Sequence, residues 1–266
     1  MHRPLLGKSI VVIGGTTGLG RSAALAVRNA GARVVVVGRT PRSLSEIGAL
    51  LGESGEPVLG DAIEVGTAER AITRCLERFG GFDGLYHVAG GSGRRRGDGL
   101  LHELTEEGWQ FTQDLNLKSV FLSNRAAVRQ FLLQGSGGSV LNCGSVLGFS
   151  PSPQFFGTHA YATAKAGLIG LTRSAAAAYA KHGIRFNVVA PALVATPMSQ
   201  RAQSDDAIRS FIKTKQPLDG GRMGVPEDLD AAVVWLLSGE SRFVTGQVIA
   251  IDGGWSHSEG QFSPLS

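Results

Sequence analysis

The chain has 266 residues, 42% of them hydrophobic and 18% charged, and a formal net charge of +4 at pH 7. A chain of this length and composition buries a sizeable core, and it is too apolar to stay disordered. Its basic residues are scattered except for Arg94, Arg95 and Arg96, so the charge pattern argues against a nucleic-acid partner. A mild positive charge is equally compatible with a small anionic ligand. We expect one globular domain spanning residues 1–266.

The cysteine content and the N-terminal sequence indicate the compartment. Cys75 and Cys143 are the two cysteines of the chain, too few for a disulfide framework. The apolar stretch near the start of the chain is too short for a signal peptide or a membrane span. We therefore expect a cytoplasmic protein that does not enter a membrane.

Short apolar runs rich in β-branched residues alternate with longer stretches of helical pattern, and no linker interrupts them. The sequence predicts strands at residues 9–14, 33–38, 56–60, 84–89, 139–144, 184–190 and 247–252. It predicts helices near residues 19–30, 42–51, 67–79, 105–134, 158–182 and 226–238. Because the strands are continuously hydrophobic, we expect helices to cover both of their faces. The prediction is an α/β fold, a Rossmann-type, doubly wound, seven-stranded parallel sheet with helices on both faces.

A glycine-rich turn joins the first predicted strand to the first predicted helix. Gly14, Gly18 and Gly20 would permit a tight turn and let the helix N-terminus approach an anion such as a pyrophosphate. One alternative is a turn that binds nothing, since glycines are common between strands and helices. A second alternative is a P-loop at residues 15–22, in which Arg21 replaces the usual lysine, although a guanidinium substitutes poorly for the compact ammonium.

The end of the second predicted strand bears on the choice between NAD and NADP. In dinucleotide-binding folds a carboxylate near this place binds the ribose 2′-hydroxyl of NAD, whereas an arginine accommodates the 2′-phosphate of NADP. Here Gly38 is followed by Arg39, and no acid stands at the tip of the strand. NADP is therefore favoured, with Arg21 as a further cation. The alternative is that Arg39 is a solvated loop residue.

Four residues form a candidate catalytic group. Tyr161 and Lys165 are four apart in a predicted helix, so they share a face, and an ammonium can stabilise the phenolate of a nearby tyrosine. Ser145 follows the fifth predicted strand at its carboxyl end, where doubly wound sheets bind ligands. Asn116 lies inside a predicted helix, where asparagine is unfavourable unless its side chain is bonded. Taken singly, each residue is also compatible with an ordinary local contact.

Together these motifs resemble those of the short-chain dehydrogenase/reductase family, from about Lys8 to Trp255. GGTTGLG is similar to the family's T-G-x-x-x-G-x-G, HVAGG to its N-N-A-G, and RFNVVAPALVATPM to its R-x-N-x-x-x-P-G-x-x-x-T. VTGQVIAIDGGW resembles the family's terminal strand. The places of the family's catalytic tetrad are occupied by Asn116, Ser145, Tyr161 and Lys165.

The resemblance implies an NADP(H)-dependent oxidoreductase that interconverts a carbonyl and a secondary alcohol. Tyr161 would be the general acid/base, Lys165 would lower its pKa and bind the nicotinamide ribose, and Ser145 would hold the substrate oxygen. Asn116 would support a water-linked proton relay. The implied cofactor-binding residues are Gly14, Thr16, Thr17, Gly18, Leu19, Gly20, Arg39, Asp61, Ala89, Gly90, Tyr161, Lys165, Val194 and Thr196, and no metal is implied. The alternative function is a sensor or scaffold that binds NADP(H) without turnover.

Several positions depart from the family pattern. Ile13 replaces the threonine before the first glycine, and Ala192 replaces the glycine after a proline. His87 and Val88 replace both asparagines of N-N-A-G. The changes at Ile13, His87 and Val88 put hydrogen bonds of the family pattern in doubt, so we expect the sheet and the turns to be tied in another way there. We interpret His87 as a core histidine.

The substrate stays open at this point, apart from its being a small carbonyl or alcohol. Residues 191–225 are expected to form a mobile lid, because long loops in compact domains tend to be functional. Arg94–Arg96 would attract an acidic substrate, or else form a solvated face or a subunit contact. In the family, the helix that corresponds to the one carrying SAAAAYA packs on a neighbouring subunit, so we expect a homotetramer or, failing that, a dimer. The expected apolar pocket lining is Phe149, Phe155, Phe156, Leu193 and Met198.

Overall fold

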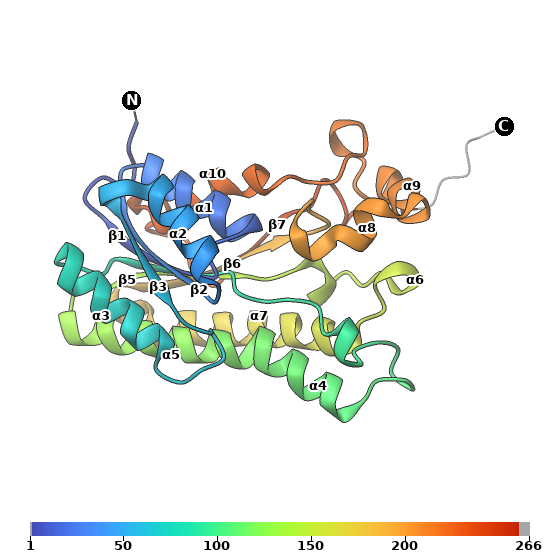
Figure 1. The fold of residues 1–266 in the computed structure, drawn as a ribbon, viewed down its shortest axis with the longest axis horizontal. Coiled ribbons are helices and arrows are strands. Elements are labelled where there is room, and N and C mark those ends of the chain that lie inside the picture. Colours follow the sequence, from blue (N-terminus) through green and yellow to red (C-terminus); the bar gives the residue numbers. More distant parts are fainter. Residues whose placement is uncertain (1, 261–266) are drawn as a thin grey trace.

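One sheet of seven strands runs through the molecule in the order β3-β2-β1-β4-β5-β6-β7, and all neighbouring strands are parallel (Figure 1). The computed structural model describes residues 2–260. The predicted fold class is confirmed, and every predicted strand is found. The strands are β1 (Ser9–Ile13), β2 (Arg33–Gly38), β3 (Gly55–Leu59), β4 (Gly84–His87), β5 (Gly138–Cys143), β6 (Ile184–Pro191) and β7 (Val248–Ile251).

The order of the strands reverses at β1, which pairs with β2 on one side and β4 on the other. At its end, Ile13 is in register with Val37 of β2 and with His87 of β4. In an open α/β sheet the connections that follow such strands diverge to opposite faces and leave a crevice at the carboxyl ends. The topology therefore places a ligand crevice beside the glycine-rich turn.

Helices cover both faces of the sheet because successive strand residues point to opposite sides. Val12 and Val36 belong to a buried cluster with α1 and α10, whereas Val11 and Val35 belong to a second cluster with α3 and α5. Figure 1 shows α1, α2 and α10 on one face and α3, α4, α5 and α7 on the other. Their bounds are α1 (Gly18–Asn29), α2 (Pro41–Leu51), α3 (Thr67–Phe79), α4 (Glu106–Gln113), α5 (Ser119–Gln134), α7 (His159–Tyr179) and α10 (Asp230–Leu237). None of the helices within residues 2–260 is long and apolar enough to cross a membrane.

The predicted helix at residues 105–134 is not continuous. A π-helical turn at Asp114–Lys118 separates α4 from α5, and Asn116 lies in its middle. Such wide turns occur mostly as single insertions in helices, often at functional sites. The asparagine therefore marks an interruption of the helix.

The segment expected to be a lid loop contains helices. Within residues 191–225 lie α8 (Gln200–Ser204) and α9 (Asp206–Lys215), and a further short helix, α6 (Pro153–Phe156), precedes α7. They pack on an aromatic group in which the rings of Phe156 and Phe211 both meet Trp255 edge-on, with ring centres 5.5 and 6.0 Å away. The segment predicted to be a mobile lid is therefore not a plain loop, because it carries two helices and Phe211 of α9 packs on this aromatic group.

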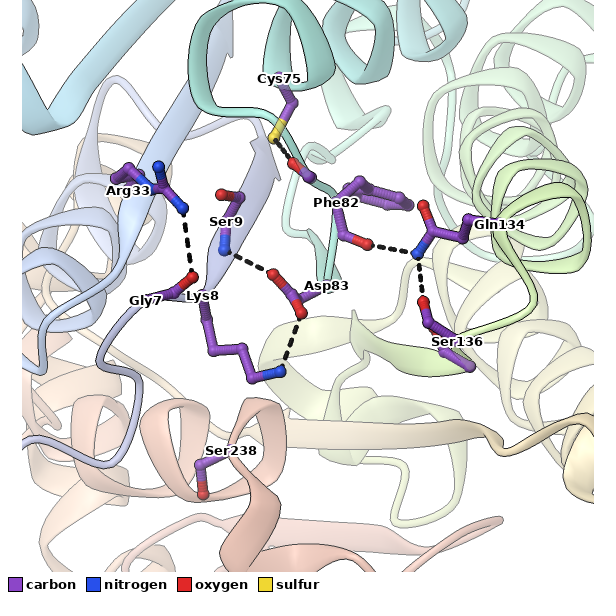
Figure 2. A network of polar contacts seen from close by, with 12 residues as sticks. Gly7, Lys8, Ser9, Arg33, Cys75, Phe82, Asp83, Gln134, Ser136 and Ser238 are labelled. Atoms are coloured by element: carbon purple, nitrogen blue, oxygen red, sulfur yellow. Dashed lines mark hydrogen bonds and ion pairs between the residues drawn. The ribbon is translucent and has the colours of Figure 1, made fainter.

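A polar network closes the amino-terminal edge of the sheet, opposite the crevice. Figure 2 shows the Asp83 carboxylate accepting hydrogen bonds from Lys8 Nζ and from the Ser9 backbone nitrogen, both at 2.9 Å. In the same view, Gln134 Nε2 of α5 donates to the carbonyl of Phe82 at 2.7 Å. The start of β1, the approach to β4 and the end of α5 are thereby joined.

Candidate active site

A cleft of about 340 Å³ lies along the carboxyl edge of the sheet, where the topology predicts it. All of the implied cofactor-binding residues line it, from the glycine-rich turn to Thr196, and so does Ser145. Asn116 is fully buried and does not line the cleft. The structure thus brings the sequence-predicted residues together in one place, with Asn116 behind the wall. Leu193 and Met198 line the cleft too, whereas Phe149, Phe155 and Phe156 do not.

The glycine-rich turn fits a pyrophosphate because its backbone has no room for side chains. Gly14 has φ +91°, and a Cβ there would stand 2.6 Å from the backbone nitrogen of Ala89. A Cβ on Gly20 would overlap the carbonyl oxygen of Gly14. The helix α1 follows at once; its first turn has no acidic residue, and the side chain of Thr17 does not cap it. The N–H groups and the dipole of α1 are therefore available to an anion.

The far end of the cleft holds a loose ion pair. Arg39 Nη1 lies 3.5 Å from Asp61 Oδ2, and 69% of the Arg39 side chain is exposed against 24% for Asp61. Such a solvent-exposed pair stabilises the fold little. Arg39 is therefore neither an isolated loop residue nor firmly held, and its guanidinium remains accessible from the cleft.

Tyr161 and Lys165 lie together on the buried face of α7. The Lys165 ammonium is 5.6 Å from the centre of the Tyr161 ring, and it donates a 2.7 Å hydrogen bond to the carbonyl oxygen of Cys143 at the end of β5. Both side chains are buried, with 9% of Tyr161 and 4% of Lys165 exposed. Burial lowers the pKa of Lys165, because the charged form loses its hydration.

Ser145 stands opposite the tyrosine at the end of β5. Its hydroxyl accepts a 3.2 Å hydrogen bond from the Leu147 nitrogen, which fixes the turn after the strand, and it lies near enough to Tyr161 to influence the pKa of the phenol. Burial raises the pKa of Tyr161, the nearby Cys143 thiol adds to this, and the Ser145 hydroxyl acts in the opposite direction. The net shift is upward, which differs from the lowered tyrosine pKa expected from the sequence. The phenol is thus held in its protonated form.

Asn116 supports the wall of the cleft through its side-chain amide. Nδ2 donates to the carbonyls of Gly91 and Thr112, both at 2.9 Å, and Oδ1 accepts from the Gly91 nitrogen at 3.0 Å. A Cβ on the adjacent Gly90 would lie 2.9 Å from Asn116 Oδ1 and 3.6 Å from Lys165 Nζ. The amide therefore fixes the bare backbone that faces the lysine.

His87 connects the end of β4 to α5 and to the turn after β4, in place of the asparagines of the family pattern. Its Nδ1 is hydrogen-bonded to Ser123 Oγ of α5 at 2.7 Å, and its Nε2 to the Ala89 carbonyl at 3.2 Å. Burial, together with the Lys165 charge, lowers the pKa of His87 to about 3. The Ile13 carbonyl completes the turn by accepting from the nitrogens of Val88 and Ala89. The interpretation of His87 as a core histidine is confirmed.

The lid side of the cleft is held by residues that the sequence analysis missed. Gln216 Oε1 accepts from the Leu193 nitrogen at 2.9 Å, and Gln216 Nε2 donates to the Leu193 carbonyl at 3.2 Å. Ser199 Oγ accepts from the Thr196 nitrogen at 3.0 Å and donates to the carbonyl of Val194 at 2.6 Å. A glutamine at the end of a helix carries no sequence signal for such a contact.

Comparison with known proteins agrees with the geometry. A family model described as enoyl-(acyl carrier protein) reductase matches residues 14–256. The chain belongs to the short-chain dehydrogenase/reductase family. It is 35% identical to 2-dehydro-3-deoxy-D-gluconate 5-dehydrogenase of Escherichia coli (strain K12), over 94% of this chain and 96% of that protein. It is 34% identical to 2,5-dichloro-2,5-cyclohexadiene-1,4-diol dehydrogenase of Sphingobium indicum, over 95% and 98%.

A solved structure shows the same fold. A short-chain type dehydrogenase/reductase from Mycobacterium ulcerans superposes with a TM-score of 0.86 at 28% identity, covering 96% of this chain and 91% of that one. As a family member, the protein is an oxidoreductase acting on CH–OH groups with NAD(P)(H). The P-loop interpretation of residues 15–22 is therefore set aside.

Proposed function

We propose that the protein is an NADP(H)-dependent oxidoreductase that interconverts a carbonyl and a secondary alcohol, with Tyr161 as general acid/base. The observation that carries the proposal is the meeting of Tyr161, Ser145 and Lys165 in the cleft beside Gly90. A phenol close to a serine hydroxyl, with a buried ammonium near its ring, is suited to moving one proton at a substrate oxygen.

The residues along the cleft fit the dinucleotide from end to end. The turn at Gly14–Gly20 would receive the pyrophosphate, Asp61 the adenine side, and Lys165 the nicotinamide ribose. The backbone near Ala89 and Gly90 would line the cleft, and Val194 and Thr196 would hold the carboxamide. The bound cofactor supplies the redox chemistry, while the protein orients both reactants and exchanges the proton.

The protonation state of the tyrosine sets the direction in which its proton moves. Since burial keeps Tyr161 in the phenol form, it is ready to donate a proton to the oxygen of a carbonyl under reduction. Ser145 holds that oxygen by its hydroxyl. Asn116, whose amide is engaged with Gly91 and Thr112, contributes to the proposed proton relay by keeping this wall in place.

The preference for NADP rests on Arg39. A 2′-phosphate offers the guanidinium two charge-assisted hydrogen bonds, which are stronger than its loose contact with Asp61. No acidic residue takes the place of Arg39 directly after β2 to repel the phosphate.

Two arginines favour an acidic substrate. Arg94 follows β4 and Arg201 lies in α8, where its Nη2 donates to the Phe155 carbonyl at 3.0 Å. Burial lowers the pKa of Arg94, and the charge of Arg201 lowers it further. Neither guanidinium is in an ion pair within the described chain. A substrate carboxylate between them would relieve the repulsion, and the E. coli relative is named for a sugar acid.

Assembly as a homotetramer fits the outer surface of the molecule. The exposed positions of α7 include Ala166, Gly167, Gly170 and Ser174, so a second helix could approach it closely. The two cysteines are free and buried, as suits the reducing cytoplasm. Light scattering at micromolar concentration tests the tetramer, and a monomeric mass contradicts it.

The experiment that tests the function follows nicotinamide absorbance with NADPH and NADH across a panel of acidic and neutral ketones and alcohols. Tyr161→Phe should abolish turnover while NADPH still binds. Wild-type binding without turnover would instead indicate a sensor. For the substrate class, Arg94→Ala and Arg201→Ala should lower kcat/KM for acidic ketones more than for neutral ones, and an unchanged ratio contradicts an acidic substrate.

A further inference from the structure

We propose that Asp98 is a positioning residue that fixes the first turn of α7 and thereby the place of the Tyr161 hydroxyl. The inference rests on the proposed function of Tyr161. Asp98 is only 3% exposed, and its carboxylate accepts two backbone hydrogen bonds, Oδ1 from the Ala160 nitrogen and Oδ2 from the Tyr161 nitrogen, both at 3.0 Å. The carbonyl of Gly99 accepts from the His159 nitrogen at 3.2 Å.

These contacts give the first backbone N–H groups of α7 hydrogen-bond partners that lie outside the helix. The first N–H groups of a helix have no partner within it, and the side chain of the residue before α7, Thr158, does not cap it. Three successive amides, at residues 159–161, instead bond to Asp98 and Gly99 of a distant loop. A carboxylate at this end is also favoured by the helix dipole. Tyr161 is the third residue of α7, in a turn that would otherwise fray.

The loop that carries Asp98 is itself held tightly. The Asp98 nitrogen donates to the Gly93 carbonyl at 3.1 Å, and the Gly97 carbonyl accepts from the Thr105 nitrogen at 3.2 Å. Side chains are excluded here, since a Cβ on Gly93 would overlap Thr112 and one on Gly97 would overlap Thr105. The carboxylate is thus delivered to α7 by a loop packed on α4.

One segment therefore links two parts of the site. Its beginning, Gly91, is gripped by the Asn116 amide, and its end, Asp98, grips the helix of Tyr161. Without the carboxylate the first turn of α7 loosens, and the position of the Tyr161 hydroxyl relative to Ser145 becomes less fixed. A small displacement of a reacting group costs a large part of the rate, whereas the pyrophosphate turn at the other end of the cleft is untouched.

The test compares Asp98→Ala, Asp98→Asn and Ser238→Ala with wild type. Ser238 is buried, and its hydroxyl accepts a hydrogen bond from the Glu240 nitrogen at the amino-terminal edge of the sheet. Ser238→Ala therefore removes a buried helix-capping side chain far from the cleft, which makes it the matched control for Asp98→Ala. The measurements are kcat, KM, the NADPH dissociation constant from cofactor fluorescence, the melting temperature, and the pH profile of kcat.

We expect Asp98→Ala to lower kcat by about 10- to 100-fold while NADPH affinity changes by less than about threefold. In the pH profile of kcat for this variant, the alkaline limb should move to lower pH. The frayed turn exposes the Tyr161 phenol to water and the negative charge of Asp98 is gone, and both changes lower the pKa of the phenol. Asp98→Asn, which keeps one acceptor oxygen, should recover part of kcat. Ser238→Ala should lower the melting temperature and leave kcat and the alkaline limb unchanged.

An unchanged kcat in folded Asp98→Ala, or joint loss of kcat and NADPH affinity, would overturn the inference. If Asp98→Ala does not fold, Asp98→Asn decides, with a reduced kcat at wild-type NADPH affinity supporting the inference and an unchanged kcat overturning it. Tyr161→Phe separates the two proposals. If that variant keeps turnover, the proposed function fails. If Tyr161→Phe is inactive but the folded Asp98 variants keep the wild-type kcat, only this inference fails.

Discussion

Lys165 of α7 donates a hydrogen bond to the carbonyl oxygen of Cys143, and this 2.7 Å contact joins the catalytic helix to the end of β5. The buried ammonium is thereby oriented between the tyrosine ring and the glycine wall of the cleft. The contact explains why a lysine whose charged form is disfavoured by burial is kept at this position: the carbonyl compensates part of its lost hydration.

Lys165→Met removes the charge at similar length. We expect kcat to fall by at least about 100-fold, because the phenolate loses its nearby cation and the ribose its donor. Stability should not fall, since no buried partner is left charged. Lys181→Met, at an exposed position after α7, is the matched control. Turnover within a few-fold of wild type in Lys165→Met would contradict this role.

The raised pKa of Tyr161 predicts different pH profiles for the two directions of reaction. Carbonyl reduction uses the phenol, so its rate should stay level through neutral pH and fall only in alkali. Alcohol oxidation uses the phenolate, so its rate should rise with pH. Because the Ser145 hydroxyl lowers the tyrosine pKa, Ser145→Ala should shift the rising limb of this profile to higher pH. Initial rates in both directions provide the check, and a bell centred on neutral pH for both would refute it.

Arg39→Ala should change the choice of cofactor. The loss of a charge-assisted contact with the 2′-phosphate corresponds to about 10- to 100-fold weaker NADPH binding, with NADH binding little changed. Arg42→Ala is the control, because Arg42 lies in the same region but is paired with Glu46 and outside the cleft. Equal effects of Arg39→Ala on both cofactors would show that Arg39 does not read the phosphate.

His87 makes the protein sensitive to acid. Its pKa is about 3 in the folded chain, against about 6.5 when exposed, so only the unfolded chain takes up this proton as the pH falls. Its contribution to the free energy of unfolding is unaffected above about pH 6.5 and decreases toward pH 3, with a loss of about 2 kcal/mol at pH 5.

His87→Asn should therefore lose less stability than wild type between pH 7.5 and pH 5, as measured by urea unfolding. His102→Asn serves as the control, because the His102 side chain is 77% exposed. Identical pH dependence in the His87 variant and the wild type would count against a neutral buried imidazole.

The features that could be predicted from the sequence are those that depend on short, local patterns of residues. The β-branched runs and the glycine turn at Gly14 predicted the strands and the crevice, and the spacing of Tyr161 and Lys165 predicted their shared face. Long-range contacts could not be predicted in this way. The grip of Asp98 on α7, the bonds of Gln216 to Leu193 and the pairing of Arg39 with Asp61 each join residues remote in the chain.

The tyrosine pKa belongs to the same group of long-range effects. A neighbouring lysine is visible in the sequence, but the burial that raises the tyrosine pKa is a property of the assembled fold. The signal for α9 was present, since Ile208, Phe211 and Ile212 follow helical spacing behind the capping Asp205, but it lay inside a segment interpreted as a loop.

The Asp83 network, shown in Figure 2, lies at the amino-terminal edge of the sheet, whereas the cleft lies at its carboxyl edge, with the length of the strands between them. Substitutions that remodel the lid to admit another substrate therefore leave the seam at Lys8, Ser9 and Asp83 intact. Because the substrate-binding residues and these stabilising contacts are at separate edges, the substrate can change while the contacts that hold the sheet together stay the same.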